Sequence, residues 1–107
     1  MAPLLASLVV ASGLFGTVHR GPITPVCRVG SPCSAPAARV RLRFVRAGLV
    51  VRSVVTSASG GYRVLLPPGT YTIRGVLSSP IERLSPATVR VGRTIARRDL
   101  YIDTGIR

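Results

Sequence analysis

Hydrophobic and charged side chains alternate along the chain from residue 39 onward. Val40, Leu42 and Phe44 fall on one side of an extended chain, and each is preceded by an arginine. A period of two, with apolar residues against charged ones, is typical of a strand that buries one face. The same alternation returns in residues 62–66 and 70–74. The pattern therefore predicts β-strands that share a core.

Turn-forming residues divide most of the sequence into short strands. We expect strands at residues 16–20, 39–44, 49–57, 62–66, 70–74, 88–91 and 94–102. The first strand is expected at a sheet edge, and the last two are expected to form a hairpin joined at Gly92-Arg93. Residues 77–86, which are rich in Ser and Pro, are expected to form a loop. Short strands with regularly spaced turns are typical of a two-layer sandwich. The prediction is an all-β, two-sheet antiparallel sandwich of about six to seven strands.

Composition supports a single domain with an aliphatic core. Of the 107 residues 47% are hydrophobic but only 5% aromatic, and Trp is absent. A chain of this length forms one domain, and Val and Ile favour strands because branching at Cβ suits a pleated sheet. We expect an apolar leader in residues 1–13, an edge strand and a cysteine-closed loop in residues 14–37, and the sandwich core in residues 38–107.

The amino terminus has the features of a secretory signal. Leu4–Val10 is an apolar run without charge, and the small residues Ala11-Ser12-Gly13 follow it. This order matches the apolar region and cleavage site of a signal peptide, which would be helical if it were retained. The alternatives are a start site further upstream and a retained anchor or buried strand. We expect a secreted or cell-envelope protein whose mature chain has no transmembrane helix.

Cys27 and Cys33 are the two cysteines of the chain. Six residue steps of extended chain span roughly 20 Å, whereas bridged Cα atoms lie about 5.5 Å apart. The turn formers Gly30, Ser31 and Pro32 let the segment double back and close. We therefore expect a Cys27–Cys33 disulfide, in agreement with export. Free thiols and a metal site are the alternatives.

The formal net charge is +12, and all 15 basic residues are arginine. One interpretation is a coding bias acting on solvated positions. The other is a polyanionic partner, either a nucleic acid or an acidic polymer of the cell envelope. The candidate polyanion face consists of Arg39, Arg41, Arg43, Arg63 and Arg74.

Aromatic residues limit what such a face can recognise. The alternation places Phe44, Tyr62 and Tyr71 in the core, which leaves Tyr101 and Phe15 exposed. Sequence-tolerant binding of single strands needs exposed aromatic platforms as well as cations. We therefore expect any polyanion binding to be electrostatic and non-specific, and we expect no specific nucleic-acid partner.

Side chains for catalysis are few. Apart from arginine, cysteine and tyrosine, the titratable residues are His19, Glu82, Asp99 and Asp103. General acid–base catalysis needs a pair of such groups in tuned environments. A phosphate-binding loop requires glycines just before a helix, whereas Gly60 and Gly61 lie between two strands. We expect no enzyme activity, no cofactor and no metal.

Residues 56–73 carry a family resemblance. The stretch Thr56-Ser57-Ala58-Ser59-Gly60-Gly61-Tyr62-Arg63-Val64-Leu65-Leu66-Pro67-Pro68-Gly69-Thr70-Tyr71-Thr72-Ile73 resembles carboxypeptidase regulatory-like domains. Those modules typically read Thr-Asp, a Gly-containing turn, an aromatic, and then Leu-Pro-Pro-Gly-x-Tyr; here Ser57 stands in place of Asp. The likeness extends more loosely over residues 38–103. Residues 21–27 and 103–107 resemble small exported actinobacterial proteins.

The resemblance implies a prealbumin-like sandwich, grouped with carbohydrate-binding-like folds. In metallocarboxypeptidases the module is an appendage to a catalytic domain, so it brings no peptidase activity with it. We expect a non-catalytic exported accessory or binding module whose ligand is a carbohydrate or a cell-envelope protein. The alternative function is non-specific binding of a polyanion through the arginine-rich face.

Overall fold

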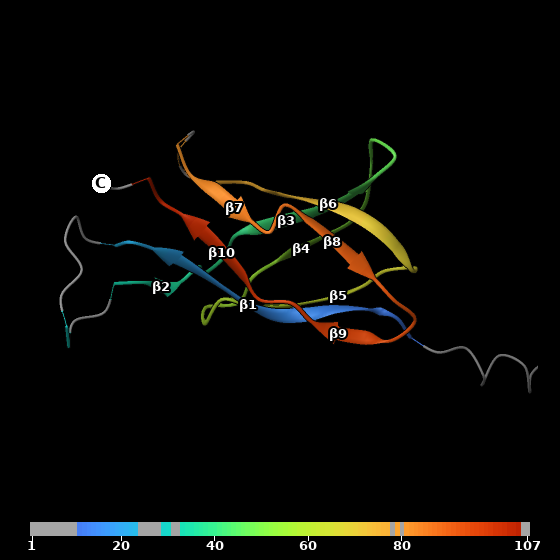
Figure 1. Ribbon diagram of the computed structural model, residues 1–107, viewed down its shortest axis with the longest axis horizontal. Coiled ribbons are helices and arrows are strands. Elements are labelled where there is room, and N and C mark those ends of the chain that lie inside the picture. The colour runs from blue at the N-terminus through green and yellow to red at the C-terminus, as the bar shows by residue number, and fades with distance from the viewer. Residues whose placement is uncertain (1–10, 24–28, 31–32, 78, 80, 106–107) are drawn as a thin grey trace, which may run out of the picture.

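The computed structural model describes residues 11–23, 29–30, 33–77, 79 and 81–105 (Figure 1). Over these residues the regular structure consists of strands alone, which form two sheets of six and four strands. The predicted all-β, two-sheet sandwich is confirmed. Ten strands are found instead of six or seven because residues 94–102 form two strands and two short strands, Ala35–Pro36 and Arg83–Ser85, lie in segments predicted as loops.

The four-stranded sheet is antiparallel throughout, in the order β4-β3-β6-β8. Its strands are β3 (Arg41–Arg46), β4 (Leu49–Val55), β6 (Gly69–Gly75) and β8 (Thr88–Val91). Ala47 and Gly48 join β3 to β4 with positive φ angles of 52° and 78°. Two successive positive φ angles are the geometry of a tight hairpin turn that matches strand twist.

The six-stranded sheet is built around the long strand β1. Its strands are β1 (Gly13–Gly21), β2 (Ala35–Pro36), β5 (Gly61–Leu65), β7 (Arg83–Ser85), β9 (Ile95–Arg97) and β10 (Leu100–Asp103). The first half of β1 lies between β5 and β9, and the second half lies between β2 and β10, with β7 beyond β10. β9 and β10 run parallel to β1 and are separated by Arg98 and Asp99. The first strand of the chain therefore pairs with the last.

The core fills the space between the sheets with the side chains that the alternation assigned to it. Val40, Leu42 and Phe44 are at most 5% exposed, and Tyr62 and Tyr71 are buried with them. The rings of Phe44 and Tyr62 stack with centroids 6.3 Å apart, which joins the two sheets. Aromatic pairs at this separation add to the free energy of burial. The predicted placement of these residues is confirmed.

Three sequence predictions about strand neighbours are wrong. Residues 16–20 belong to the central strand β1, not to an edge strand, because Leu14 and Val18 are fully buried and strands pair on both sides of β1. Residues 88–102 form no hairpin, since β8 pairs with β6 and β9 pairs with β1, so that Gly92-Arg93 crosses between the sheets. The predicted loop at 77–86 contains β7, which pairs with β10.

The Leu-Pro-Pro-Gly stretch is held by contacts around Tyr71. The Tyr71 hydroxyl donates a hydrogen bond to the Pro67 carbonyl at 2.6 Å. The Arg46 guanidinium lies 5.9 Å from the centre of the Tyr71 ring and donates to the Pro68 carbonyl at 3.2 Å. A Cβ at Gly69 would lie 2.7 Å from the Nη1 atom of Arg46. The Arg46 guanidinium could move aside, but Gly69 has a φ of 155°, which residues with a side chain rarely adopt, and this backbone conformation favours glycine at position 69.

Hydroxyl groups fix the connection from β4 to β5, where the chain passes from one sheet to the other. Thr56, which is 2% exposed, donates through Oγ1 to the Ala37 carbonyl at 2.5 Å and accepts from the Val40 N–H at 2.8 Å. Ser57 Oγ accepts a hydrogen bond from the Gly61 N–H at 3.0 Å. Ser57 therefore supplies the side-chain oxygen that holds this turn.

Two sequence predictions fall partly or wholly outside the described residues. The predicted signal, residues 1–13, lies outside them except for its last three residues; Gly13 belongs to β1, and the Ser12 carbonyl accepts from the Leu66 N–H at 3.0 Å. Cys27 also lies outside, so the Cys27–Cys33 disulfide stays a prediction. The Ile23 N–H donates to the Cys33 carbonyl at 2.8 Å, which brings the two ends of the cysteine-containing loop together.

Candidate functional site

The outer surface of the four-stranded sheet carries four exposed arginines, which we call the arginine face. They are Arg41 and Arg43 on β3, Arg74 on β6 and Arg90 on β8. Their neighbours along each strand point into the core, because successive side chains of a strand alternate between its faces. The four guanidinium groups therefore lie on one surface.

Arg43 and Arg74 are the closest pair on this face. They are register partners on the antiparallel strands β3 and β6, and Cβ atoms of such partners lie about 4.5–5.5 Å apart. Like charges directly opposite each other destabilise a sheet. Within the described part of the chain neither side chain forms an ion pair. An anion placed between the two guanidinium groups would relieve their repulsion.

No acidic residue occurs in any of the four strands of this sheet. Hydroxyl side chains accompany the arginines instead, and Arg41 donates to Ser53 Oγ at 3.2 Å. Thr70, Thr72 and Thr88 are exposed on the neighbouring strands. Guanidinium and hydroxyl groups together donate hydrogen bonds to phosphate or carboxylate oxygens. The surface can therefore recognise anions and has no aromatic platform.

The structure brings together three of the five arginines of the predicted polyanion face. Arg39 lies in the turn before β3, where it has a φ of 59°. Arg63 lies on the opposite sheet, because β5 pairs with β1 and places it beside Phe15. Arg90 was missed by the sequence prediction. Its alternation with Val89 and Val91 indicated exposure, but only the pairing of β8 with β6 places it on this face.

The outer surface of the six-stranded sheet is chemically different. Phe15 lies in register between Arg63 and Arg97, and the Arg97 guanidinium is 5.9 Å from the centre of its ring. Arg97 Nε also bonds both carboxylate oxygens of Asp99 at 3.2 Å. Phe15 is 37% exposed and Tyr101 41%. The two aromatic residues predicted to be exposed are therefore exposed, and both lie on this sheet.

Asp99 is held by the strand beside it. It accepts hydrogen bonds from the Thr17 N–H at 3.0 Å and the Thr17 hydroxyl at 3.3 Å. The Thr17 N–H, followed by the Arg97 side chain, keeps the pKa of the Asp99 carboxyl below its ordinary value. The carboxylate therefore remains charged near neutral pH, and it links β1 to the break between β9 and β10.

Tyr62 fixes the same break from the core side. Its hydroxyl donates to the Arg98 carbonyl at 2.5 Å. Gly16 makes room for this contact, since a Cβ there would lie 2.4 Å from the Arg98 carbonyl oxygen. Burial, together with the charge of Asp99, raises the pKa of Tyr62 to about 12. The phenol therefore stays protonated near neutral pH and serves as a structural donor.

Arg20 and Glu82 form the more buried of the two ion pairs among the described residues. Their Nη1 and Oε2 atoms are 3.5 Å apart, and the side chains are 28% and 6% exposed. Arg20 follows Leu14 and Val18 on the inward face of β1. The pair therefore lies at one end of the core, where it joins β1 to the segment before β7.

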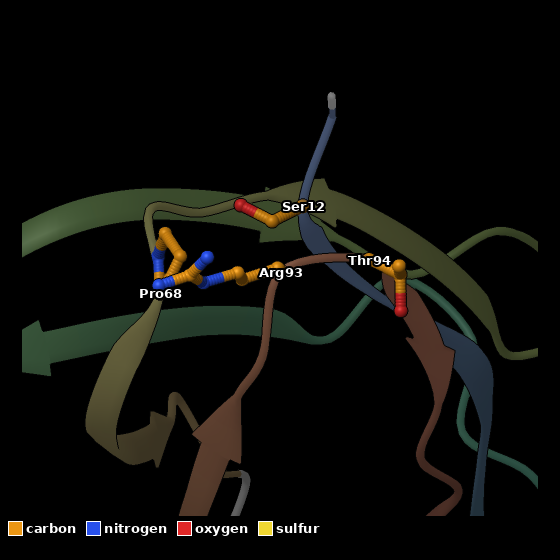
Figure 2. A pocket seen from close by; sticks show the side chains of 4 residues that line it. All are labelled: Ser12, Pro68, Arg93 and Thr94. Carbon is orange, nitrogen blue, oxygen red and sulfur yellow. The ribbon is translucent and has the colours of Figure 1, made fainter. Parts of the chain in front are cut away.

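A cavity of about 370 Å³ opens at the other end of the sandwich. Ser12, Pro68, Arg93 and Thr94 line it, and the Arg93 side chain extends toward Pro68 (Figure 2). Ser12 Oγ is already used, because it donates to the Leu66 carbonyl at 2.6 Å. The lining supplies one guanidinium and two hydroxyl groups, a set that can contact an anion but cannot exchange protons near neutral pH.

The described residues contain no group of three His, Cys, Asp or Glu that could hold a metal ion. Among them there is also no helix long and apolar enough to cross a membrane. No protein-family model matches the chain, and no curated protein matches it either.

Proposed function

We propose that the chain is a non-catalytic binding module of the cell envelope and that its arginine face binds an anionic polymer. The observation that carries the proposal is the direct opposition of Arg43 and Arg74 on a sheet without any acidic residue. This arrangement opposes folding in the absence of a ligand. A bound polyanion turns the same arrangement into a source of binding free energy.

The spacing of the arginines suits a chain of phosphate groups. Arg41 and Arg43 are two residues apart on one strand, which separates them by about 6.7 Å. Arg74 lies one strand away from Arg43, at about 4.8 Å in the hydrogen-bonding direction. Guanidinium groups bind phosphate oxygens in a bidentate manner. A phosphodiester or similar polymer laid across β3 and β6 would contact three guanidinium groups in succession.

The other parts of the proposal come from the sequence. Export is inferred from the apolar residues 1–13 and a disulfide from Cys27 and Cys33, and residues 56–73 resemble carboxypeptidase regulatory-like domains. That resemblance favours a second ligand class, a neutral carbohydrate or an envelope protein. The exposed aromatic residues Phe15 and Tyr101, on the opposite sheet, are the groups that would support it.

A binding titration at low and high salt separates these ligand classes. The probes are a poly(glycerol phosphate) teichoic acid, duplex DNA and insoluble peptidoglycan. We expect weak binding to both soluble polyanions that falls steeply as salt rises, because each phosphate contact releases a condensed counterion. With three contacted phosphates, the affinity for duplex DNA should fall about 40-fold between 50 and 200 mM salt.

Tight binding to peptidoglycan that does not depend on salt would overturn the proposal. So would the absence of any polyanion binding at low salt. Mass measurement of the exported protein tests the rest, since signal cleavage shortens the chain and a disulfide lowers its mass by two hydrogens.

A further inference from the structure

An apolar patch flanked by arginines lies on the outer surface of the six-stranded sheet, where the chain enters β1. We call it the Phe15 patch; it consists of Phe15, Leu65 and Ile95 with Arg63 and Arg97. Leu65 is 52% exposed and Phe15 37%. These side chains come from β1, β5 and β9, which lie side by side at this end of the molecule (Figure 1).

The register orders the patch into an apolar row and a basic row. Leu65 and Ile95 are the partners of Gly13, which has no side chain to separate them. Two residues further along β1, about 6.7 Å away, Arg63 and Arg97 flank Phe15. The apolar side chains therefore gather toward the end of the sheet, and the two guanidinium groups lie behind them.

This order matches the depth profile of a bilayer surface. Apolar side chains enter the boundary between headgroups and acyl chains, while arginines remain at the level of the phosphates. Anionic headgroups attract basic residues near the surface by about 1 kcal/mol each. The net charge of +12 adds a long-range attraction to such a surface.

We propose that the Phe15 patch docks on an anionic lipid bilayer, with Leu65, Ile95 and Phe15 entering the interface and Arg63 and Arg97 contacting lipid phosphates. This site differs from the arginine face in both location and partner. The module would then have one sheet against the membrane and the other free to hold an anionic polymer.

The absence of Trp from the chain gives a direct test. A Phe15→Trp variant of the full chain carries a single tryptophan in the patch. A Tyr101→Trp variant carries one on β10 of the same sheet, opposite His19 and outside the patch. Both are mixed with vesicles of equimolar phosphatidylglycerol and phosphatidylcholine, and with vesicles of phosphatidylcholine alone. We expect a blue shift of emission for the first variant with anionic vesicles only, and an unchanged spectrum for the second.

Further substitutions measure how much each part of the patch contributes. In vesicle sedimentation, Leu65→Ser should lower the affinity for anionic vesicles about tenfold, because a half-exposed leucine loses its burial in the interface. Arg63→Gln should lower it about fivefold. Since both side chains are exposed, folding should be retained, and near-ultraviolet circular dichroism checks this. Replacing Arg43 and Arg74 by Gln should leave the emission shift intact.

Three results would overturn the proposal. The first is no sedimentation with anionic vesicles. The second is sedimentation without any change in the emission of the Phe15→Trp variant, since another part of the chain would then carry the binding. The third is an equal emission shift of both tryptophan variants. None of these results depends on polymer binding, so the arginine face is tested separately.

Discussion

The two sheets of the sandwich use the same charged side chain in opposite ways. On the four-stranded sheet, Arg43 and Arg74 face each other, and no acid is present in its strands. On the six-stranded sheet, Arg97 bonds Asp99, and Arg20 bonds Glu82. The three acidic residues of the chain all belong to this second sheet or to the segments beside it. Charge is therefore distributed unevenly between two surfaces of one small domain.

The difference separates structural arginines from available ones. An arginine that bonds a carboxylate has part of its donors occupied, and it contributes to folding where the pair is buried. An arginine opposite another arginine contributes nothing favourable to the sheet, and its donors remain free for a ligand. Counting arginines along the sequence cannot distinguish the two groups, because the distinction depends on which strands are neighbours. The following predictions test whether it holds.

The largest effect is expected at the Arg20–Glu82 pair. Replacing Arg20 by Met leaves the carboxylate of Glu82, which is 6% exposed, without this cation. Removal of one partner from a buried ion pair is strongly destabilising. Because Arg20 is itself partly exposed, we expect the free energy of unfolding to fall by about 2–3 kcal/mol. Chemical denaturation of Arg20→Met, Glu82→Gln and the double variant measures the coupling between the two side chains.

The matched control is the ion pair on the surface of the same sheet. Arg97→Gln breaks the contact with Asp99, where both side chains are more than half exposed. Exposed pairs contribute little because water and salt screen them. The unfolding midpoint should not change measurably. Equal losses for Arg20→Met and Arg97→Gln would contradict the difference in burial on which this prediction depends.

The second prediction concerns the arginine face. Changing Arg43 and Arg74 together to Gln removes two cations that lie side by side. The affinity for duplex DNA or teichoic acid at low salt should fall about 10- to 30-fold, and the slope of log affinity against log salt for DNA should decrease by about 1.8. Folding should be unaffected or slightly more stable, because the like-charge contact is lost.

Its control is the pair of arginines beside Phe15. Arg63→Gln with Arg97→Gln also removes two positive charges, so the net charge falls by the same amount. If the polymer affinity depends on the arginine face, this second double variant should retain most of it. An equal loss in both double variants would mean that overall charge, not the face, determines binding.

Much of the fold was predictable because burial follows the alternation of side chains. Val40, Leu42 and Phe44 had to share one side of a strand, and so did Tyr62 with Leu66; the structure buries all five. Such local patterns decide which residues face the core. They also identified Phe15 and Tyr101 as the exposed aromatics.

Strand neighbours were not predictable in the same way. The assignment of residues 16–20 to an edge failed because the pairing of β1 with β10 joins residues far apart in sequence. The hairpin at Gly92-Arg93 failed because a glycine-containing turn and a crossover between sheets look alike in sequence. For the same reason Arg63, which is exposed, was grouped with the arginine face, and Arg90 was left out.

The third prediction uses the pKa of Tyr62, which burial raises from 10.0 to about 12. Because the unfolded chain releases this proton more readily, the stability linked to Tyr62 is complete below pH 10 and is lost as pH rises from 10 toward 12. Tyr62→Phe should cost about 1 kcal/mol at neutral pH, through loss of the bond to the Arg98 carbonyl. Its unfolding midpoint should fall less steeply than that of the native chain between pH 10 and pH 12. Parallel curves for the two proteins would show that Tyr62 is not the group responsible.

The smallest effect is expected at Ser57, where the chain passes between the two sheets. Its hydroxyl accepts the Gly61 N–H at 3.0 Å and lies 3.1 Å from Ser59 Oγ. Ser57→Ala removes the acceptor and should cost about 1 kcal/mol. Ser57→Asp keeps an acceptor and adds a charge that strengthens both bonds, so it should equal or exceed the native stability by a few tenths of a kcal/mol.

Thermal unfolding at low and high salt then distinguishes a local contact from general relief of positive charge. If the unfolding temperature of Ser57→Asp is still raised at high salt, the gain comes from the hydrogen bonds of the turn, because bonds at this distance are screened little. The Ser53→Asp variant places the same charge beside Arg43 on the arginine face, and it should gain stability that high salt removes. If both variants respond to salt alike, an Asp at position 57 has no special role at this turn, and the two sheets differ only in where their charges lie.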